Sequence, residues 1–480
     1  MIERVAIVGG GVIGAGWAAR LAMNGIGTVI YDPDSEAPRK VAETMQNAAA
    51  ACAKLTAAPR PPFAAPSFAG SVSAAVSDAE WIIESVPERA ELKQKVYAEI
   101  EKTADKRAII SSSTSGFRPG MLQKNMKYPE RFLVAHPFNP VYLLPLVEVV
   151  RGGGTASRTA ERVCEILSAL GMRPLHIKKE IDAFVADRLM EAAWREALWL
   201  VKDGVATTAD VDDAIRFGFG LRWAQMGAFE TFRIAGGEGG ITHFLRQFGP
   251  CLKLPWTKLT DVPELTEEFA DKIAAQSDAQ SGRYSVRELE RIRDDNLIAF
   301  LHVLKANRWG AGETLAAWEN RLQTRAPSPD ISLPLRTLSR RAPRHWTDYN
   351  GHINESRYLE CFSDASDSVL RLIGAGGGYV VAGNSYFTVE THIRNIGEAR
   401  AGDMIYGDST VLLAEGKKIK LFHELRGEDG GAFATGEHLL IHVDLNTRRS
   451  SLPSEEVLNA AAAIAAAHAK LPPPEGAGRI

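Results

Sequence analysis

The chain has 480 residues, which is too many for one hydrophobic core, and about three domains are expected. Hydrophobic residues make up 45% and charged residues 24%, as in ordinary globular proteins, and the net charge of −3 gives no reason to expect a nucleic acid or a membrane as partner. No apolar stretch is long enough to span a bilayer. The four cysteines have neither metal-ligand nor redox spacing, so we expect a cytoplasmic protein without a metal site.

The chain begins with a strand, a tight turn and a helix in close succession. The apolar run Val5–Val8 leads into a Gly-x-Gly-x-x-Gly segment made of Gly9, Gly10, Gly11, Val12, Ile13 and Gly14. The first glycine of the motif would allow the turn, the second would let the backbone approach a pyrophosphate, and the third would let the helix pack on the strand. The helix N-terminus offers free N–H groups and a positive dipole end to phosphates.

A second apolar run, Thr28–Tyr31, ends at the acid Asp32. Its carboxylate would accept hydrogen bonds from the adenosine ribose hydroxyls, and its charge would repel a 2′-phosphate. Strand, turn, helix, second strand and acid occur in the order of a dinucleotide-binding unit. The sequence therefore predicts a site for NAD rather than NADP.

Residues 1–180 alternate strand-like and helix-like segments, which predicts a mostly parallel, doubly wound α/β sheet of the Rossmann type. Beyond the first two strands, we expect strands at Trp81–Ser85, Ala108–Ser111, Phe132–Ala135 and Leu146–Val149. Residues 181–325 predict an all-helical domain, with helical patterns from Phe184 onward, at Thr208–Phe217 and at Ser285–Lys305. A proline-punctuated linker, residues 326–334, follows.

Residues 331–450 show one amphipathic helix, Asn354–Ile373, and then a glycine cluster. The strands expected after it are Tyr379–Ala382, Tyr386–Ile396, Met404–Ala414, Lys418–Gly427 and Ala432–Leu445. A helix followed by long antiparallel strands predicts an α+β domain in which a sheet wraps one helix. The tail, residues 451–480, contains an Ala-rich helix at Ser454–Lys470 that should pack on this domain, and we expect the last ten residues to be disordered.

A histidine and a glutamate stand out in the first region. His136 follows an expected strand, and Glu148 lies on the next one. In a doubly wound sheet, ligands bind beyond the carboxyl ends of the strands. A neutral imidazole there can take the proton of a secondary alcohol while the cofactor takes the hydride, and a carboxylate on the far ring nitrogen fixes the tautomer. For an isolated histidine, a buried side chain without a catalytic role is the preferred interpretation.

The first 325 residues resemble the 3-hydroxyacyl-CoA dehydrogenase superfamily. Besides the glycine loop, the matching segments are Ser85-Val-Pro-Glu88 with Lys93, Ser111–Ser115, His136–Pro140, Leu146–Val149 and Phe184–Met190. The resemblance implies that His136 is the base, that Glu148 orients it, and that Ser112 contacts the substrate oxygen. It also implies that Asn139 lies between substrate and nicotinamide, and that Glu88 and Lys93 line the nicotinamide-ribose side.

Some positions depart from the fatty acyl-CoA enzymes. Asp187 and Ser113 stand where those enzymes usually carry Asn, and the segment Gly220–Gly227 is more similar to the L-gulonate and L-carnitine dehydrogenases. These branches act on free polar hydroxy acids.

L-Carnitine carries a trimethylammonium group, which aromatic faces and a carboxylate can hold. Phe138 and Trp223 are candidates for the aromatic faces, Asp187 for the counter-charge and Ser115 for a further substrate contact. Aromatic residues on helices are more often part of the core.

A second group of polar residues precedes the helix of the third region, with Asp348 followed by Gly351-His-Ile-Asn354. N–H groups at the helix N-terminus would polarise a thioester carbonyl, and a carboxylate could activate water or attack the carbonyl. From spacing alone, Asp348 and Asn354 are better explained as turn and capping residues.

The motif and the order of helix and strands resemble the hot-dog acyl-CoA thioesterases of the 4-hydroxybenzoyl-CoA thioesterase type, over residues 335–445. The resemblance implies Asp348 as the catalytic acid and an acyl-CoA thioester as substrate. It also implies a homodimer or higher homo-oligomer with sites between subunits.

The whole chain is similar to the family of L-carnitine dehydrogenases fused to betainyl-CoA thioesterases. This similarity implies NAD-dependent oxidation of L-carnitine to 3-dehydrocarnitine and hydrolysis of betainyl-CoA to glycine betaine and CoA. The alternatives for the dehydrogenase part are a 3-hydroxyacyl-CoA dehydrogenase and an L-gulonate 3-dehydrogenase. The hot-dog part could instead hydrolyse another acyl-CoA or serve as a non-catalytic oligomerisation module.

Overall fold

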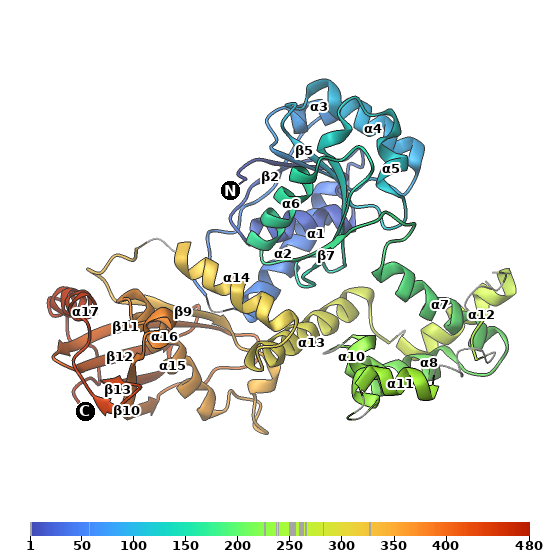
Figure 1. Ribbon diagram of the computed structural model, residues 1–480. Helices are drawn as coiled ribbons and strands as arrows, with labels where there is room; N and C mark the ends of the chain where they lie inside the picture. Colours follow the sequence, from blue (N-terminus) through green and yellow to red (C-terminus); the bar gives the residue numbers. More distant parts are fainter. Residues whose placement is uncertain are drawn as a thin grey trace. The chain divides into compact units, whose positions relative to one another are not determined.

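The computed structural model describes residues 2–480 except 57, 225–226, 237, 239, 249–255, 259–263, 265, 282 and 326–327. The chain divides into two compact units, one of residues 1–49 and 60–321 and the other of residues 50–59 and 322–480 (Figure 1). The segment Gly220–Gly227 and the linker 326–334 lie partly outside the described residues, and Cys251 lies wholly outside them. Domain boundaries at residues 180, 325 and 450 remain a prediction.

A sheet of eight strands forms the centre of the first unit: β1 (Val5–Val8), β2 (Thr28–Tyr31), β3 (Ser67–Phe68), β4 (Trp81–Glu84), β5 (Ile109–Ser112), β6 (Phe132–Pro137), β7 (Leu146–Val150) and β8 (Arg173–Ile177). Their order is β3-β2-β1-β4-β5-β6-β7-β8. Strands β1 to β6 run parallel, whereas β7 is antiparallel to β6 and parallel to β8. This arrangement confirms the Rossmann-type sheet.

The two strands that the sequence did not predict, β3 and β8, lie at the two edges of this sheet. Both β3 residues are exposed, and no residue of β8 is fully buried. Neither strand needs the run of apolar residues that marks a buried strand, which is why the hydrophobic pattern did not reveal them.

The helices of the sheet region connect successive strands (Figure 1), and they are α1 (Val12–Ala22), α2 (Ala37–Leu55), α3 (Val72–Val76), α4 (Ala90–Thr103), α5 (Pro119–Leu122) and α6 (Ser157–Ala169). Nine of the eleven residues of α1 are buried, most of them Ala or Gly. The indole ring of Trp17 in α1 packs edge-on against that of Trp81 in β4, with ring centroids 5.6 Å apart. The packing holds α1 against the sheet, and the short turn between Val8 and Val12 sets the N-terminus of α1 at the carboxyl end of β1.

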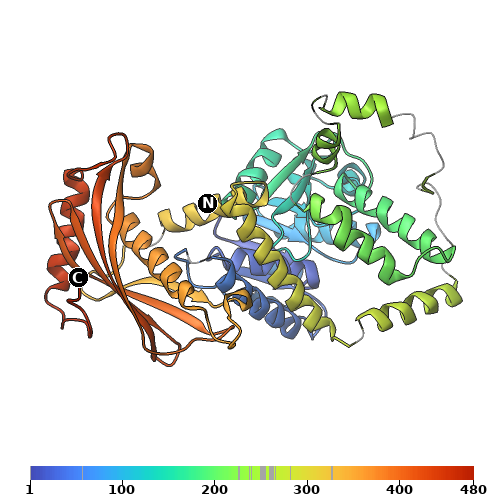
Figure 2. The ribbon, with the colours of Figure 1, turned by 90° about the horizontal axis from the view of Figure 1, so that it is seen from below.

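Between residues 186 and 325 the described residues contain helices and loops but no strand, as the sequence predicted (Figure 2). The helices are α7 (Ala186–Lys202), α8 (Thr208–Ala214), α9 (Gly220–Trp223), α10 (Ala228–Ala235), α11 (Gly240–Phe248), α12 (Glu267–Ser281), α13 (Val286–Ala306) and α14 (Ala311–Arg325). Capping boxes begin α8 and α13, where Thr207 and Ser285 accept the N–H of a residue three positions on. None of the helices among the described residues is apolar over a bilayer-spanning length.

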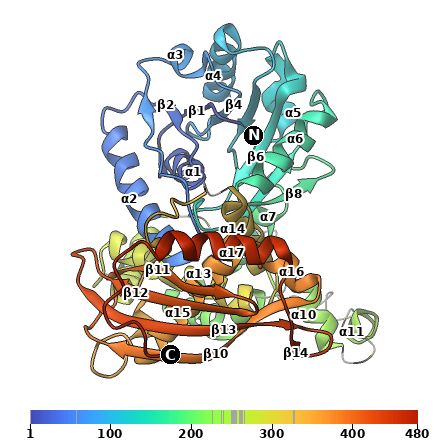
Figure 3. The same cartoon turned by 90° about the vertical axis from the view of Figure 1, so that its left-hand side faces the viewer.

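The second unit is an antiparallel sheet with helices (Figure 3), built from β9 (Leu335–Arg341), α15 (Glu355–Leu372), α16 (Gly377–Val381), β10 (Asn384–Asn395), β11 (Met404–Glu415), β12 (Lys418–Arg426), β13 (Ala432–Asp444), β14 (Arg449–Ser450) and α17 (Glu455–His468). The strand order is β10-β13-β12-β11-β9, with β14 beside β13. Phe362 of α15 is fully buried in one core with Leu338 and Leu425 of the sheet. Val457 and Ile464 of α17 join a second core that also contains the end of α15. The predicted hot-dog architecture is confirmed.

Four details of the second unit differ from the sequence predictions, and the first is the short strand β14, which was not predicted and whose two residues are exposed. Tyr379–Ala382 is not a strand, because residues Gly377–Val381 form α16, whose one anchored side chain is Tyr379, bonded to His442 Nε2 at 2.8 Å. Strand β9 was not predicted, since only Leu335 and Leu338 of its seven residues are buried. The last ten residues form no helix or strand, but they are not free: Gly478 and Arg479 donate N–H groups to the buried Glu437 at 2.9 and 2.8 Å.

Candidate active sites

The glycine loop has the geometry that a dinucleotide pyrophosphate needs. Gly9 adopts φ +104°, which favours glycine, and a Cβ on Gly14 would lie 1.9 Å from the carbonyl oxygen of Gly9. A Cβ on Gly11 would meet no atom within 4 Å, so the space in front of the loop is open. The first N–H groups of α1, at Val12 and Ile13, have no partner within a helix and point to this end. These residues fit the phosphates of NAD.

Asp32 follows β2 and is tied to the same loop. Its Oδ2 accepts the N–H of Gly10 at 2.6 Å, and its Oδ1 accepts the N–H of Asp34 at 2.8 Å. Each carboxylate oxygen can accept more than one hydrogen bond. The two contacts therefore fix the carboxylate at the end of β2 and leave acceptor capacity for ribose hydroxyls.

His136 and Glu148 form a cross-strand pair. His136 lies within β6, not beyond its end as the sequence suggested, and the antiparallel register sets it directly opposite Glu148 of β7. His136 Nδ1 lies 3.0 Å from Glu148 Oε2, and both residues are buried. Side chains of directly opposed residues lie on the same face of a sheet. His136 and Glu148 can therefore form a hydrogen bond although they are twelve positions apart in the sequence.

The other oxygen of Glu148 is held by the beginning of α7. Oε1 accepts the N–H groups of Val185 and Ala186 at 2.9 and 3.0 Å. Burial acts to raise the pKa of Glu148, but the hydrogen bonds from His136, Ala186 and Val185 outweigh it, so the pKa is lowered. Glu148 is thus kept ionised against the imidazole.

The turn that aims α7 at Glu148 is unusual, because Ala183 and Phe184 have φ values of +57° and +48°. Left-handed backbone costs a non-glycine residue roughly 1 kcal/mol or more. Two contacts hold it: Phe184 is fully buried, with its ring centroid 5.8 Å from that of His136, and the Ala183 N–H donates to Gly116 O at 3.0 Å. This turn was not predicted, because neither residue is a glycine.

Asp187, on the first turn of α7, faces the second nitrogen of His136. Its Oδ2 lies 3.9 Å from His136 Nε2. Burial raises the pKa of Asp187, and the neighbouring His136 works against that rise. Phe138 also contacts the imidazole, with ring centroids 4.7 Å apart. The structure therefore joins four predicted residues, His136, Glu148, Asp187 and Phe138.

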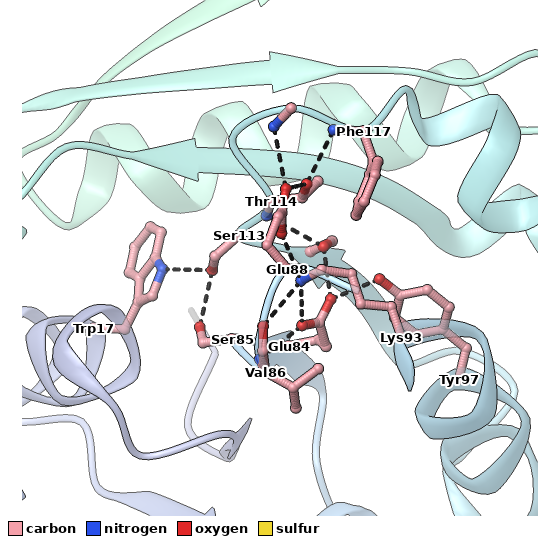
Figure 4. A network of polar contacts seen from close by, with 12 residues as sticks. Trp17, Glu84, Ser85, Val86, Glu88, Lys93, Tyr97, Ser113, Thr114 and Phe117 are labelled. Atoms are coloured by element: carbon pink, nitrogen blue, oxygen red, sulfur yellow. Dashed lines mark hydrogen bonds and ion pairs between the residues drawn. The ribbon is translucent and has the colours of Figure 1, made fainter. Parts of the chain in front are cut away.

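A separate buried network surrounds Glu84 at the end of β4 (Figure 4). Its carboxylate accepts Ser112 Oγ–H at 2.6 Å and Lys93 Nζ at 2.7 Å. Ser112 is fully buried, so its predicted substrate contact would require the substrate hydroxyl to reach it from the pocket side. Glu84 was not among the predicted site residues, although an acid that ends the apolar strand Trp81–Glu84 was a visible signal.

Glu88 and Lys93 do not share one environment. The Lys93 side chain is 1% exposed and the Glu88 side chain 42% exposed, with 3.3 Å between Lys93 Nζ and Glu88 Oε2. Glu88 Oε1 accepts the Thr114 hydroxyl and the Gly116 N–H. Of the two, Glu88 is the one that a ligand can reach.

The remaining candidates lie apart from the His136–Glu148 pair in different ways. Asn139 is exposed just after β6, and Ser115 is half-buried in the loop after β5. Trp223 lines a cavity of about 410 Å³ together with Glu230 and Trp309. That cavity contains none of the residues around His136, so the structure does not bring Trp223 together with Phe138 and Asp187.

In the second unit, Asp348 sits in a tight turn before α15. Its Oδ1 accepts the Asn350 N–H at 2.8 Å, and its carbonyl oxygen accepts the Gly351 N–H at 3.1 Å, where Gly351 has φ +82°. Asn354 caps α15 by accepting the Ser356 N–H at 3.0 Å. Asp348 is thus a turn residue and Asn354 a helix cap, as the spacing predicted. The turn also holds the half-buried carboxylate of Asp348 a few residues before the N-terminus of α15.

Comparisons with known proteins agree with this architecture. Residues 4–181 match the family "3-hydroxyacyl-CoA dehydrogenase, NAD binding domain", residues 184–268 match "3-hydroxyacyl-CoA dehydrogenase, C-terminal domain", and residues 343–461 match the "Thioesterase-like superfamily". A solved structure of a pyridine-carboxylic acid 5-dehydrogenase, described as an NAD+ dependent dismutase, is 27% identical with a TM-score of 0.54. It covers 64% of this chain and 99% of its own. The first unit is therefore an NAD-binding dehydrogenase.

Curated relatives extend the likeness to the whole chain. A protein of Ruegeria pomeroyi named L-carnitine dehydrogenase/betainyl-CoA thioesterase is 53% identical over 98% of both chains. A Mesorhizobium japonicum protein named L-carnitine dehydrogenase is 56% identical over 65% of this chain and 87% of its own. The chain belongs to the family of bifunctional L-carnitine dehydrogenase/betainyl-CoA thioesterases.

Proposed function

We propose that this chain oxidises L-carnitine to 3-dehydrocarnitine with NAD and hydrolyses betainyl-CoA to glycine betaine and CoA. The observation that carries the proposal is the 53% identity to the Ruegeria pomeroyi enzyme across both units. A cytoplasmic location is part of the proposal, consistent with the free cysteines Cys52, Cys164 and Cys361 among the described residues.

His136 acts as the base of the oxidation. With Nδ1–H donated to Glu148, the Nε2 lone pair is available for the hydroxyl proton of the substrate. Glu148, fixed by the two N–H groups of α7, stabilises the imidazolium that results. The glycine loop and Asp32 would hold NAD, which when bound would accept the hydride.

The position of Asp187 favours a substrate that carries a positive charge. The nitrogen of a 4-trimethylammonium group is two bonds from the carbinol carbon of a 3-hydroxy acid. Asp187 Oδ2 lies 3.9 Å from the nitrogen that takes the hydroxyl proton, so it is within reach of such a charge. Phe138, against the imidazole, offers one aromatic face to the cation.

Asp348 serves the second reaction, in which it activates water or attacks the thioester carbonyl. The N-terminus of α15 would polarise that carbonyl through its free N–H groups. We also propose that the protein is a homodimer or higher homo-oligomer. The exposed apolar side chains Leu189, Met190 and Trp194 of α7, and Phe387 and Val389 of the edge strand β10, favour association with a second copy.

A substrate panel tests the dehydrogenase proposal. NADH absorbance should rise with L-carnitine and stay flat with 3-hydroxybutyryl-CoA and L-gulonate. Reduction of NAD by 3-hydroxybutyryl-CoA but not by L-carnitine would instead establish a 3-hydroxyacyl-CoA dehydrogenase. Release of free thiol from betainyl-CoA, followed in the same preparation, tests the second activity, and its absence would leave the hot-dog domain as an oligomerisation module.

A further inference from the structure

Glu84 is a charged residue in a position where the fold alone would favour an apolar one. It ends the strand β4, whose other residues are Trp81, Ile82 and Ile83, and it has no exposed surface. Its two oxygens accept four hydrogen bonds, from Val86 N at 2.7 Å, Lys93 Nζ at 2.7 Å, Tyr97 Oη at 2.6 Å and Ser112 Oγ at 2.6 Å. A buried ion pair rarely stabilises a fold more than apolar packing does, so a role beyond stability is indicated.

The four bonds join separate parts of the chain (Figure 4). Val86 belongs to the loop after β4, Lys93 and Tyr97 to α4, and Ser112 to the end of β5. Lys93 then continues the chain of contacts outward, with Nζ 3.2 Å from Val86 O and 3.3 Å from Glu88 Oε2.

Glu88 completes the link between the two loops. It follows β4, yet its Oε1 accepts the hydroxyl of Thr114 and the N–H of Gly116, at 3.2 Å for the latter, in the loop after β5. The loops 85–89 and 113–117 are therefore tied at the surface by Glu88 and underneath by Glu84, with Lys93 between the two carboxylates.

The strand order shows what lies above these loops. Strands β4 and β5 stand between β1, which carries the glycine loop, and β6, which carries His136. A dinucleotide bound with its pyrophosphate at the glycine loop and its reactive ring beside His136 must cross the carboxyl ends of β4 and β5.

We propose that Glu84 is a positioning residue of the dehydrogenase, which through Lys93 and Ser112 fixes the two loops that support the nicotinamide half of the cofactor. The inference deepens the proposed dehydrogenase function and rests on its NAD site. Because the Ser112 hydroxyl hydrogen is directed to Glu84, the Ser112 oxygen can only accept a hydrogen bond from a ligand.

The test is the variant Glu84→Gln, which keeps the shape of the side chain and removes its charge. NADH affinity, measured by fluorescence titration of the full-length protein without any alcohol substrate, should fall at least about tenfold, because binding would then have to order loops that Glu84 no longer holds in place. kcat for NAD reduction should fall as well, and thioester hydrolysis in the second unit should be unchanged. Because the titration needs no substrate, a protein that does not oxidise L-carnitine would overturn the proposed function and leave this inference standing.

Two comparisons make the result specific. Glu80→Gln changes a carboxylate at the other end of β4, which accepts the N–H groups of Glu3 and Arg4, and it should leave NADH affinity unchanged. Adding Lys93→Met to Glu84→Gln removes the charge that lost its partner, so the double variant should lose less affinity than the two single losses combined.

NADH affinity and kcat within about twofold of the unsubstituted protein in Glu84→Gln would overturn the inference, as would equal losses in thioester hydrolysis. If Glu84→Gln does not fold, Glu84→Asp keeps the charge with a shorter reach and is expected to weaken NADH binding to an intermediate degree. Full NADH affinity in Glu84→Asp together with full affinity in Lys93→Met would then count against the proposal.

Discussion

At the scale of single residues, the proposed oxidation depends on one imidazole that has a carboxylate near each ring nitrogen. Glu148 contacts Nδ1 of His136 at 3.0 Å, and Asp187 lies 3.9 Å from Nε2. Both ring nitrogens of His136 therefore lie near a carboxylate, one within hydrogen-bond distance and one beyond it. The proposed base therefore lies close to Asp187, the carboxylate proposed to pair with the cationic group of the substrate.

His136→Ala removes the base and should lower kcat for NAD reduction by at least about a hundredfold, the usual scale for general base catalysis. NADH absorbance with L-carnitine as substrate measures the loss. Betainyl-CoA hydrolysis by the same variant is the internal control and should be unchanged. A variant that keeps more than about a tenth of its turnover would show that another group takes the proton.

Asp348→Asn should have the opposite effect. Asn keeps the acceptor oxygen that holds the Asn350 N–H, so the turn should persist while the carboxylate chemistry is lost. Thiol release from betainyl-CoA is expected to fall about a hundredfold or more, with NAD reduction unaffected. Undiminished thiol release would assign Asp348 to the turn alone.

At the scale of elements, Gly14 and Gly11 are needed for different reasons. Gly14 allows α1 to pack close to the chain at Gly9, whereas Gly11 borders open space. A Cβ on Gly14 would overlap the carbonyl oxygen of Gly9, whereas a Cβ on Gly11 meets only open space. Gly14→Ala should therefore destabilise the first unit, and Gly11→Ala should leave thermal unfolding unchanged.

The consequence for cofactor binding is distinct. If the pyrophosphate approaches through the space in front of Gly11, as the glycine motif predicts, Gly11→Ala should weaken NADH binding by roughly tenfold in a well-folded protein. Gly70→Ala, another substitution into open space, serves as the control. Equal NADH affinity in Gly11→Ala and Gly70→Ala would argue against this path for the pyrophosphate.

Three buried histidines lie on β12 and β13, and two of them, His423 and His438, pack against Phe362 of α15. His423 bonds Ser366 of the helix at 2.9 Å and Ser409 of β11 at 2.7 Å, and the ring of His438 lies 5.2 Å from that of His423. Burial lowers the pKa of His438 to about 4 and that of His423 well below its usual range. Both are therefore neutral in the folded domain.

An unfolded histidine has a pKa of about 6.5, so between about pH 6.5 and pH 4 the unfolded chain binds more protons than the folded domain. The stabilisation is complete above this range and is lost as pH falls through it. We expect amide hydrogen exchange in β12 and β13, corrected for intrinsic rates, to be faster at pH 5 than at pH 7. His438→Gln should reduce this dependence, and His392→Gln on β10 should not; equal protection at both pH values would contradict the argument.

At the scale of the whole molecule, two units with separate cores carry two candidate sites. The edge strand β10 exposes Phe387 (41%) and Val389 (54%), as a strand that pairs with another copy would. Val389→Glu should lower the molar mass measured by light scattering and, if the thioesterase site lies between subunits, also slow thiol release. Leu452→Glu, which changes a 71% exposed residue outside the strand, should alter neither, and an unchanged mass in Val389→Glu would move the interface elsewhere.

The parts of this protein that follow from local sequence are those whose chemistry is itself local. The glycine loop with Asp32, the helix α15 capped by Asn354 and the long strands β10 to β13 were all predicted, because each depends on the spacing of residues close in the chain. Exposed edge strands such as β8 and β9 were not, since few of their residues contribute to the core.

The catalytic arrangement needed the tertiary structure. The sequence supplied His136 and Glu148, but the antiparallel register of β6 and β7 set them opposite each other, and the left-handed turn at Phe184 brought α7 to Glu148. The contact between Glu84 and Ser112 likewise depends on the parallel pairing of β4 and β5, which sets the two residues opposite each other. Residue types and spacing by themselves determined which chemistry the chain can perform, whereas long-range strand pairing decided which residues perform it, because side chains distant in sequence interact only after the backbone has aligned them.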